Sequence, residues 1–183
     1  MNPRKNNTLA EIKSTLDLVL RISPDQAYRV LKDRKGEYGM IICTIGFAKK
    51  NLRAFIKKLQ LAGVNKVIDI RLHNTSPLAG YAKKDDLEYI LSLVDIGCEH
   101  HPELAPTEEI LDGYKKKKLS WQDYERKFKE VLAQRNPLQG INFMNEKGPV
   151  CLLCAEDKPI QCHRRLVAEY YSANIGGLQI KHL

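Results

Sequence analysis

Residues 40–46 read Met-Ile-Ile-Cys-Thr-Ile-Gly, and this stretch decides the fold class of the 183-residue chain. A continuous run of mostly β-branched apolar side chains that ends at a glycine is typical of a strand buried on both faces. Such strands occur in parallel sheets that are covered by helices on either side. The segment therefore predicts an α/β protein.

The segments that follow repeat this alternation of helix and strand. Residues 49–61 have apolar side chains at helical spacing, Gly63 ends the helix, and residues 67–72 form a second apolar run. Further strands, separated by helices, are predicted near Cys98, at 150–155 and at 178–183. We therefore expect a mostly parallel sheet with helices on both faces, in a Rossmann-like three-layer arrangement.

The chain is predicted to consist of an extension and one domain. Residues 1–36 predict an N-terminal helical extension, because apolar side chains recur at every third or fourth position. Residues 40–183 predict a single α/β domain, since domains commonly have about 100–200 residues. Within that domain, residues 106–135 predict a helical insertion between two strands.

Charge and cysteine content limit the class of partner. The chain has 30 Lys+Arg against 22 Asp+Glu, a formal charge of +8, which favours an anionic small molecule or nucleic acid as partner. No apolar run approaches the roughly 18–20 residues of a membrane span, and no signal-peptide core is present, so we expect no membrane association and a cytoplasmic protein. The five unevenly spaced cysteines are predicted to be reduced thiols.

Polar residues gather at the predicted carboxyl ends of the strands. In open parallel sheets, ligands bind in the crevice outside those ends. We therefore expect one shared site there. Its candidate residues, strand by strand, are Thr44 and Gly46, then Asp69 and Arg71, then His101, then Cys154 and Glu156.

Asp69 and Arg71 lie two residues apart in an apolar strand and so point to the same face. In a functional interpretation, Arg71 binds phosphate or carboxylate, and Asp69 orients Arg71 or acts as a base. In the alternative interpretation, the two residues form a structural ion pair.

Cys162, His163 and Arg164 lie at a predicted helix start. The helix dipole and the neighbouring cations favour a thiolate, so Cys162 is a candidate nucleophile, although free cysteines often serve only as small buried hydrophobes. A zinc site of Cys154, Cys162 and His163 is a third interpretation. Cys151 does not fit that site, because residues three apart in a strand face opposite sides.

The lysine run 115–118 adjoins Tyr114 and is close to Trp121. It predicts either a nucleic-acid backbone site with aromatic stacking or simply a solvated helix end. The chain has no glycine-rich phosphate loop of the dinucleotide or nucleoside-triphosphate kind, so we predict no cofactor.

Four ordered segments resemble the prokaryotic family known as domain of unknown function 488. They are Cys43–Phe47, Val67–Arg71 with Pro77 after it, His101–Leu104, and Leu153–Glu156 followed by Cys162–Arg165. The resemblance covers about residues 40–183. The family has no settled activity, so the resemblance marks positions without assigning a reaction. Residues 72–75 and 105–106 depart from the family pattern, both at the mouth of the predicted crevice.

The combined prediction is an enzyme or binder that acts on a phosphorylated or nucleotide-type anionic substrate, free or within nucleic acid. A non-catalytic basic interaction module and a Cys/His metal-binding protein are the alternatives. No metal ligand is assigned. The predicted catalytic residues are Asp69, Glu156, Cys162 and His163, and the predicted substrate-binding residues are Thr44, Gly46, Arg71, His101, Cys154 and Arg164.

Overall fold

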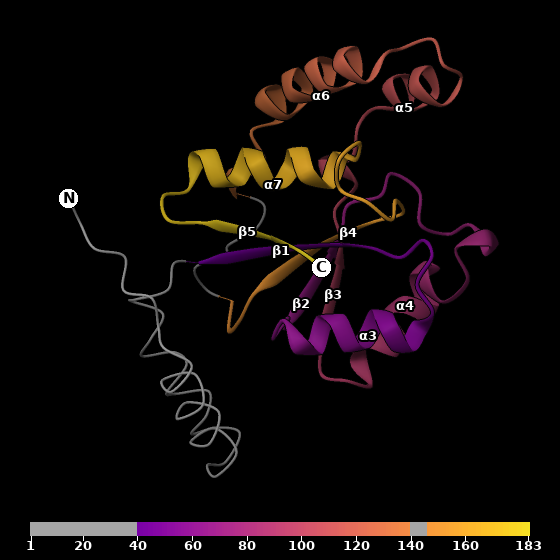
Figure 1. The fold of residues 1–183 in the computed structure, drawn as a ribbon, viewed down its shortest axis with the longest axis vertical. Coiled ribbons are helices and arrows are strands. Elements are labelled where there is room, and N and C mark those ends of the chain that lie inside the picture. The colour runs from indigo at the N-terminus through magenta and orange to yellow at the C-terminus, as the bar shows by residue number, and fades with distance from the viewer. Residues whose placement is uncertain (1–39, 140–145) are drawn as a thin grey trace. The chain divides into compact units, whose positions relative to one another are not determined.

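A computed structural model gives the fold and describes residues 40–139 and 146–183. The predicted helical extension at 1–36 lies outside the described residues. In chain order (Figure 1), the strands and α-helices are β1 (Ile41–Gly46), α3 (Leu52–Leu61), β2 (Lys66–Asp69), α4 (Lys84–Ser92), β3 (Gly97–His100), α5 (Glu108–Lys115), α6 (Trp121–Arg135), β4 (Val150–Cys154), α7 (His163–Asn174) and β5 (Gln179–His182).

The five strands of the described region form one sheet in the order β3-β2-β4-β1-β5, and every neighbouring pair is parallel. Strand β4 thus lies between β1 and β2, with Gly46 opposite Cys154 at the carboxyl end. The prediction of an α/β fold on a parallel sheet is confirmed. Because all strands run the same way, their carboxyl ends share one edge.

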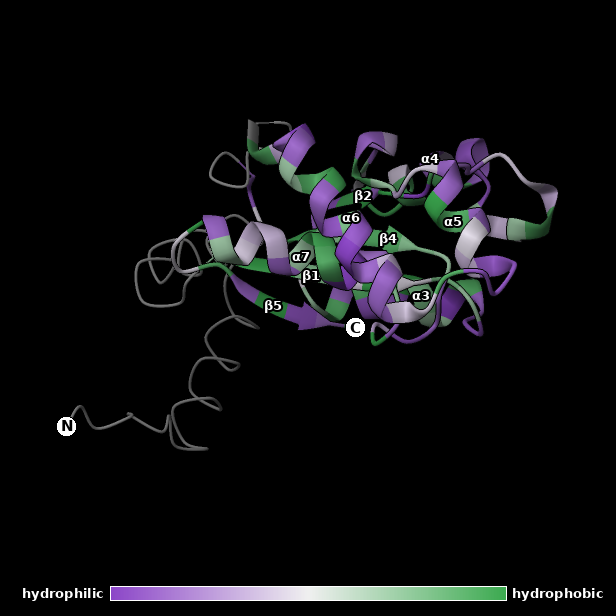
Figure 2. Ribbon diagram, turned by 90° about the horizontal axis from the view of Figure 1, so that it is seen from above, coloured by the Kyte–Doolittle hydropathy of each residue, from purple (hydrophilic) through white to green (hydrophobic). Residues whose placement is uncertain are grey.

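Alternation along the strands creates two separate cores. Ile42 of β1 belongs to the core that includes side chains of α6 and α7, whereas Cys43 and Ile45 belong to the core that includes side chains of α3 and α4. Figure 1 shows α7 on one side of the sheet and α3 and α4 on the other. In Figure 2 the inner strands β1 and β4 are mainly hydrophobic, whereas the edge strand β5 is largely hydrophilic. The predicted three-layer arrangement is confirmed.

Helix starts are marked by capping residues. The Asn51 side chain accepts a hydrogen bond from the Ala54 amide at the start of α3, and the Ser120 side chain accepts one from the Asp123 amide at the start of α6. Helix α7 differs: its N-cap residue is Cys162, whose side chain makes no capping hydrogen bond. The Cys162 thiol is therefore available for other contacts.

Helices α5 and α6 occupy the segment where the sequence predicts an insertion between strands. Phe128 and Leu132 of α6 pack in the same core as Leu166 of α7, so α6 forms a further helical layer over that face. No helix in the described ranges is both long and apolar enough to cross a membrane.

Candidate functional site

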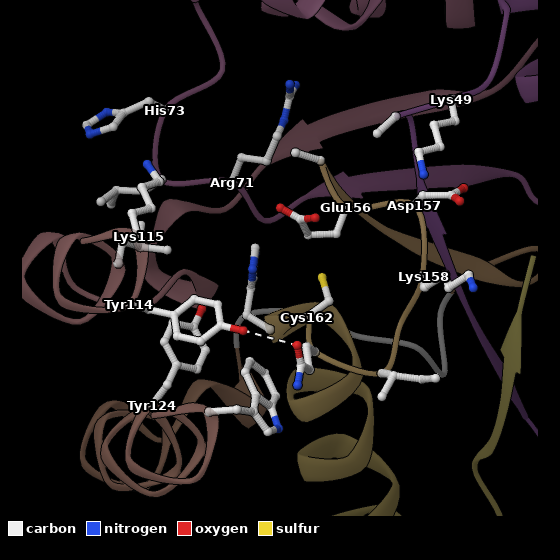
Figure 3. Close-up of a pocket in the computed structure, with 18 residues that line it drawn as sticks. Lys49, Arg71, His73, Tyr114, Lys115, Tyr124, Glu156, Asp157, Lys158 and Cys162 are labelled. Atoms are coloured by element: carbon white, nitrogen blue, oxygen red, sulfur yellow. Dashed lines mark hydrogen bonds between the residues drawn. The ribbon is translucent and has the colours of Figure 1, made fainter. Parts of the chain in front are cut away.

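A cavity of about 600 Å³ opens at the carboxyl edge of the sheet. Its floor consists of the segments that follow β1, β2 and β4, and its side wall consists of α5 and the start of α6 (Figure 3). The polar and aromatic residues that line it are Lys49, Arg71, His73, Tyr114, Lys115, Trp121, Tyr124, Glu156, Asp157, Lys158, Gln161, Cys162 and His163.

Cys162 lies at the wall of this cavity, at the N-terminus of α7, and is only 2% exposed. Its Sγ is 2.7 Å from the Sγ of Cys154, the last residue of β4. The Arg164 Nη1 atom is 3.3 Å from the Cys162 sulfur and 3.2 Å from the Cys154 sulfur. One guanidinium nitrogen therefore contacts both thiols.

The two thiols have opposite electrostatic surroundings. The pKa of Cys162 is lowered to about 4, chiefly by the hydrogen bond from Cys154, and further by the hydrogen bond and charge of His163 and by the charge of Arg164. Burial opposes this shift. For Cys154, burial raises the pKa well above 9.0, the ordinary value for a thiol. These opposite shifts favour Cys162 as the sulfur that carries negative charge and Cys154 as the sulfur that keeps its proton.

Arg164 connects the thiol pair to the loop between β4 and α7. The residue is 1% exposed, and its guanidinium donates to the carbonyl oxygens of Glu156 at 2.6 Å and Asp157 at 3.0 Å. Its Nε is buried and has no hydrogen-bond partner among the described residues. A buried cation requires compensating charge, and the Cys162 thiolate supplies it.

Gly46 allows this loop to approach β1. A Cβ atom on Gly46 would lie 1.6 Å from the Glu156 carbonyl oxygen and 3.1 Å from Arg164 Nη1. Beyond the strand, the Ala48 amide donates to the Ala155 carbonyl at 3.0 Å. The glycine predicted as a substrate-binding residue thus lies under the loop, where it leaves room for the Arg164 contacts.

Asp69 and Arg71 form a buried, two-pronged ion pair. Arg71 Nε and Nη2 each lie 2.7 Å from an oxygen of the Asp69 carboxylate, which also accepts from Asn74. Arg71 Nη2 donates to the Ala82 carbonyl as well. Arg71 lines the cavity, but Figure 3 shows its side chain extending away from Cys162. This geometry favours the structural interpretation of the pair, and the roles of anion clamp and base stay predictions.

His163 and Glu156 lie beside Cys162 in the cavity wall. The His163 Nε2 atom donates to the Ile70 carbonyl at 3.0 Å, and the ring packs edge-on against Phe128. These contacts hold the imidazole between the end of β2 and the thiolate. Glu156 is exposed, and in Figure 3 its carboxylate lies between Arg71 and Cys162.

Thr44 and His101 are not among the cavity-lining residues, and neither are the predicted site residues Gly46, Asp69, Cys154 and Arg164. The Thr44 hydroxyl is fully buried and lies 2.7 Å from His182 Nδ1, which links β1 to β5. His101 lies between Glu99 and Glu103 and contacts both carboxylates. Their predicted roles in substrate binding stay untested.

The cavity lining includes residues that the sequence analysis did not single out, among them Lys49 and Lys158. Both are exposed, and both lie in the segments that follow β1 and β4, a position that could have singled them out. Together with Lys115 they place three ammonium groups around the opening, and none of them forms a salt bridge within the described residues (Figure 3).

The ligand atoms of Cys154, Cys162 and His163 lie within 4.8 Å of one another, which is the spacing of a metal site. The Arg164 guanidinium, however, already contacts both sulfurs, and His163 Nε2 is bonded to the Ile70 carbonyl. A metal ion would be repelled by that fixed cation. The arrangement fits a thiolate neutralised by arginine better than a metal centre.

Comparison with known proteins places the chain in a family. No curated protein and no solved structure matches it. The family described as "Domain of unknown function DUF488" matches residues 51–171, more than half of the chain, and this range includes β2, β4 and the start of α7 with its thiol pair. The protein therefore belongs to the DUF488 family.

Proposed function

We propose that the protein is an enzyme that uses the Cys162 thiolate as a nucleophile on an anionic substrate of nucleotide type. The observation that carries this proposal is the place of the Cys162 sulfur, at the wall of a cavity of about 600 Å³ and 3.3 Å from the Arg164 guanidinium, surroundings in which its pKa is lowered to about 4. A buried cysteine with a purely structural role has a raised pKa, as Cys43 does in the opposite core, where burial raises it to about 11.

The charge and shape of the cavity support the substrate class. Lys49, Lys115 and Lys158 surround the opening, where ammonium groups attract a phosphate or carboxylate. On one wall, Trp121 stacks on Tyr124 with ring centroids 4.9 Å apart, and Tyr114 packs against both rings. An aromatic wall beside cations suits a flat ring that carries an anionic group.

The proposed reaction has two steps. Cys162 Sγ forms a bond to the electrophilic atom of the substrate while the bond to the leaving group breaks, and the leaving group takes up a proton from solvent. The Glu156 carboxylate then takes a proton from a water molecule, whose hydroxide part bonds to the substrate and displaces the Cys162 sulfur as thiolate. Glu156 releases that proton to solvent, which restores both residues. Arg164 acts behind the thiolate by stabilising its charge.

Protection of Cys162 from iodoacetamide tests this proposal. We expect adenosine monophosphate to slow alkylation of Cys162 several-fold, and to do so at lower concentration than adenosine or inorganic phosphate alone, because only the nucleotide contacts both the aromatic wall and the lysines. The absence of any slowing by the nucleotide would overturn the substrate class.

A matched pair of lysine variants locates the binding site. Lys49→Ala and Lys158→Ala each remove a cation at the cavity and should raise the nucleotide concentration needed for protection. Lys57→Ala removes a cation that is also exposed but belongs to α3, outside the cavity lining, and should leave that concentration unchanged. Equal effects of all three variants would indicate general charge attraction and would contradict the proposed site.

A substrate within nucleic acid is the extended form of the proposal. Lys115 lines the cavity, and Lys116, Lys117 and Lys118 continue from it as exposed residues. A single-stranded oligonucleotide should then protect Cys162 with a steep salt dependence, which alanine substitutions at residues 115–118 would flatten. Protection by the oligonucleotide that is independent of salt would contradict this form.

The proposed enzyme uses no metal ion at Cys154 and Cys162, and it acts in the cytoplasm. The guanidinium between the sulfurs supports an enzyme without a metal ion at Cys154 and Cys162, so stoichiometric zinc in protein purified without chelator would contradict it. All five cysteines are free thiols, which supports the reducing cytoplasm as the site of action.

A further inference from the structure

The two thiols at the cavity have the geometry of a dithiol redox pair. The sulfurs of Cys154 and Cys162 are 2.7 Å apart, whereas the bond in a disulfide is about 2.05 Å long, so only a small movement separates the two states. Cys162 is the N-cap of α7 and makes no capping hydrogen bond, so its side chain can turn toward Cys154 without loss of a cap.

The positions of the two thiols differ in a way that assigns them distinct roles. Cys162 is 2% exposed and lines the cavity, which is the side from which a small oxidant approaches, whereas Cys154 is fully buried and does not line it. Arg164 Nη1 contacts both sulfurs and keeps them adjacent. The lowered pKa of Cys162 makes it the sulfur that reacts first, and the protonated Cys154 is the second thiol.

We propose that a hydroperoxide switches the site off by converting Cys154 and Cys162 into a reversible disulfide. The Cys162 thiolate attacks the peroxide oxygen, the O–O bond breaks, and the released alkoxide or hydroxide takes up a proton to leave an alcohol or water with Cys162 sulfenic acid. The Cys154 sulfur then attacks the sulfenic sulfur, its proton leaves with the hydroxyl group as water, and the disulfide forms. An external dithiol returns both thiols.

This regulation acts on the nucleophile of the proposed function and deepens that proposal. The disulfide removes the thiolate from the cavity, so the oxidised protein has no nucleophile for its substrate. It also shields Cys162 from further oxidation to sulfinic acid, which is irreversible in most proteins.

The test is a thiol count after brief treatment of the full chain with hydrogen peroxide, followed by a maleimide block and peptide mass mapping. We expect two of the five thiols to become unreactive, a Cys154–Cys162 cross-link that lacks two hydrogens, and complete recovery with dithiothreitol. Retention of all five thiols, or a cross-link between other cysteines, would overturn the inference.

Two variants separate the role of Cys154 from general oxidation. Cys154→Ser should accumulate Cys162 sulfenic acid, detected as a dimedone adduct, and then sulfinic acid that dithiothreitol does not reduce. Cys98→Ser, at a half-buried thiol of β3 outside the site, should form the cross-link as the wild type does. If dithiothreitol restores the free thiols of Cys154→Ser as completely as those of the wild type, the inference is contradicted. If Cys154→Ser does not fold, the peptide mass map of the oxidised wild type decides the question.

The two proposals fail separately. If the nucleotide protects Cys162 but peroxide yields no cross-link, the redox switch is wrong and the proposed substrate class stands. If the cross-link forms but no nucleotide protects Cys162, the switch stands and the substrate class is wrong.

Discussion

Replacing Cys154 by alanine removes the largest cause of the low Cys162 pKa while leaving His163 and Arg164 in place. The lost contact is a hydrogen bond to a thiolate across 2.7 Å. A hydrogen bond to a charged group contributes about 1.5–3 kcal/mol. Since one pKa unit corresponds to about 1.4 kcal/mol, we expect the Cys162 pKa to rise by about one to two units.

The assay is the ultraviolet absorbance of the thiolate as a function of pH, with the curve of a Cys162→Ser variant subtracted. In the wild type the midpoint should be near pH 4, and in Cys154→Ala it should be near pH 5 to 6. Cys98→Ala is the control and should leave the midpoint unchanged. The reasoning is refuted if the wild-type midpoint is near the ordinary 9.0, or if Cys154→Ala does not move it.

Three other predictions concern stability. Gly46→Ala places a Cβ atom 1.6 Å from a backbone oxygen and should lower the unfolding free energy by about 1–3 kcal/mol or more. The control Gly176→Ala, whose Cβ atom would have nothing within 4 Å, should change it by less than about 0.5 kcal/mol. Similar midpoints of urea unfolding for both variants would contradict the close approach of the loop to Gly46. Asp69→Asn leaves the buried Arg71 without its charge partner and should cost about 3–5 kcal/mol in the same assay; an unchanged midpoint would show that the pair is dispensable. The Cys162 pKa falls from 9.0 in the unfolded chain to about 4 in the folded one, so the contribution of the thiolate to stability is full above pH 9 and is lost as pH drops toward 4. Over that interval the unfolding free energy of Cys162→Ser should therefore fall less than that of the wild type. Parallel plots of unfolding free energy against pH for the two proteins would contradict the assigned pKa.

The fold class could be predicted from the sequence because the information for it lies in local patterns. The apolar runs that became β1 and β4 are buried on both faces, and such runs have few alternatives to a parallel sheet. Strand alternation also predicted that Cys151 and Cys154 point to opposite faces of the sheet, and the structure places these residues in different cores. The strand order β3-β2-β4-β1-β5 could not be predicted, because it depends on contacts between distant segments.

Local patterns revealed the residue types at the site but not which groups face the cavity. Arg71 and Arg164 both looked like anion-binding arginines in the sequence. In the structure Arg71 is bonded to Asp69, and Arg164 is buried behind the thiols. The sequence did not single out Lys49 and Lys158, yet they line the opening. The difference lies in the hydrogen-bond partners of each side chain, which only the folded chain defines.

The central claim is that Cys162 is a thiolate that can be reached from the cavity. Treatment of the full chain with a limiting amount of iodoacetamide at about pH 6, followed by peptide mass mapping, tests it most directly. The account predicts that the label is found almost entirely on Cys162, because burial raises the pKa values of Cys43, Cys98, Cys151 and Cys154. Labelling of the half-buried Cys98 in preference to Cys162 would contradict it.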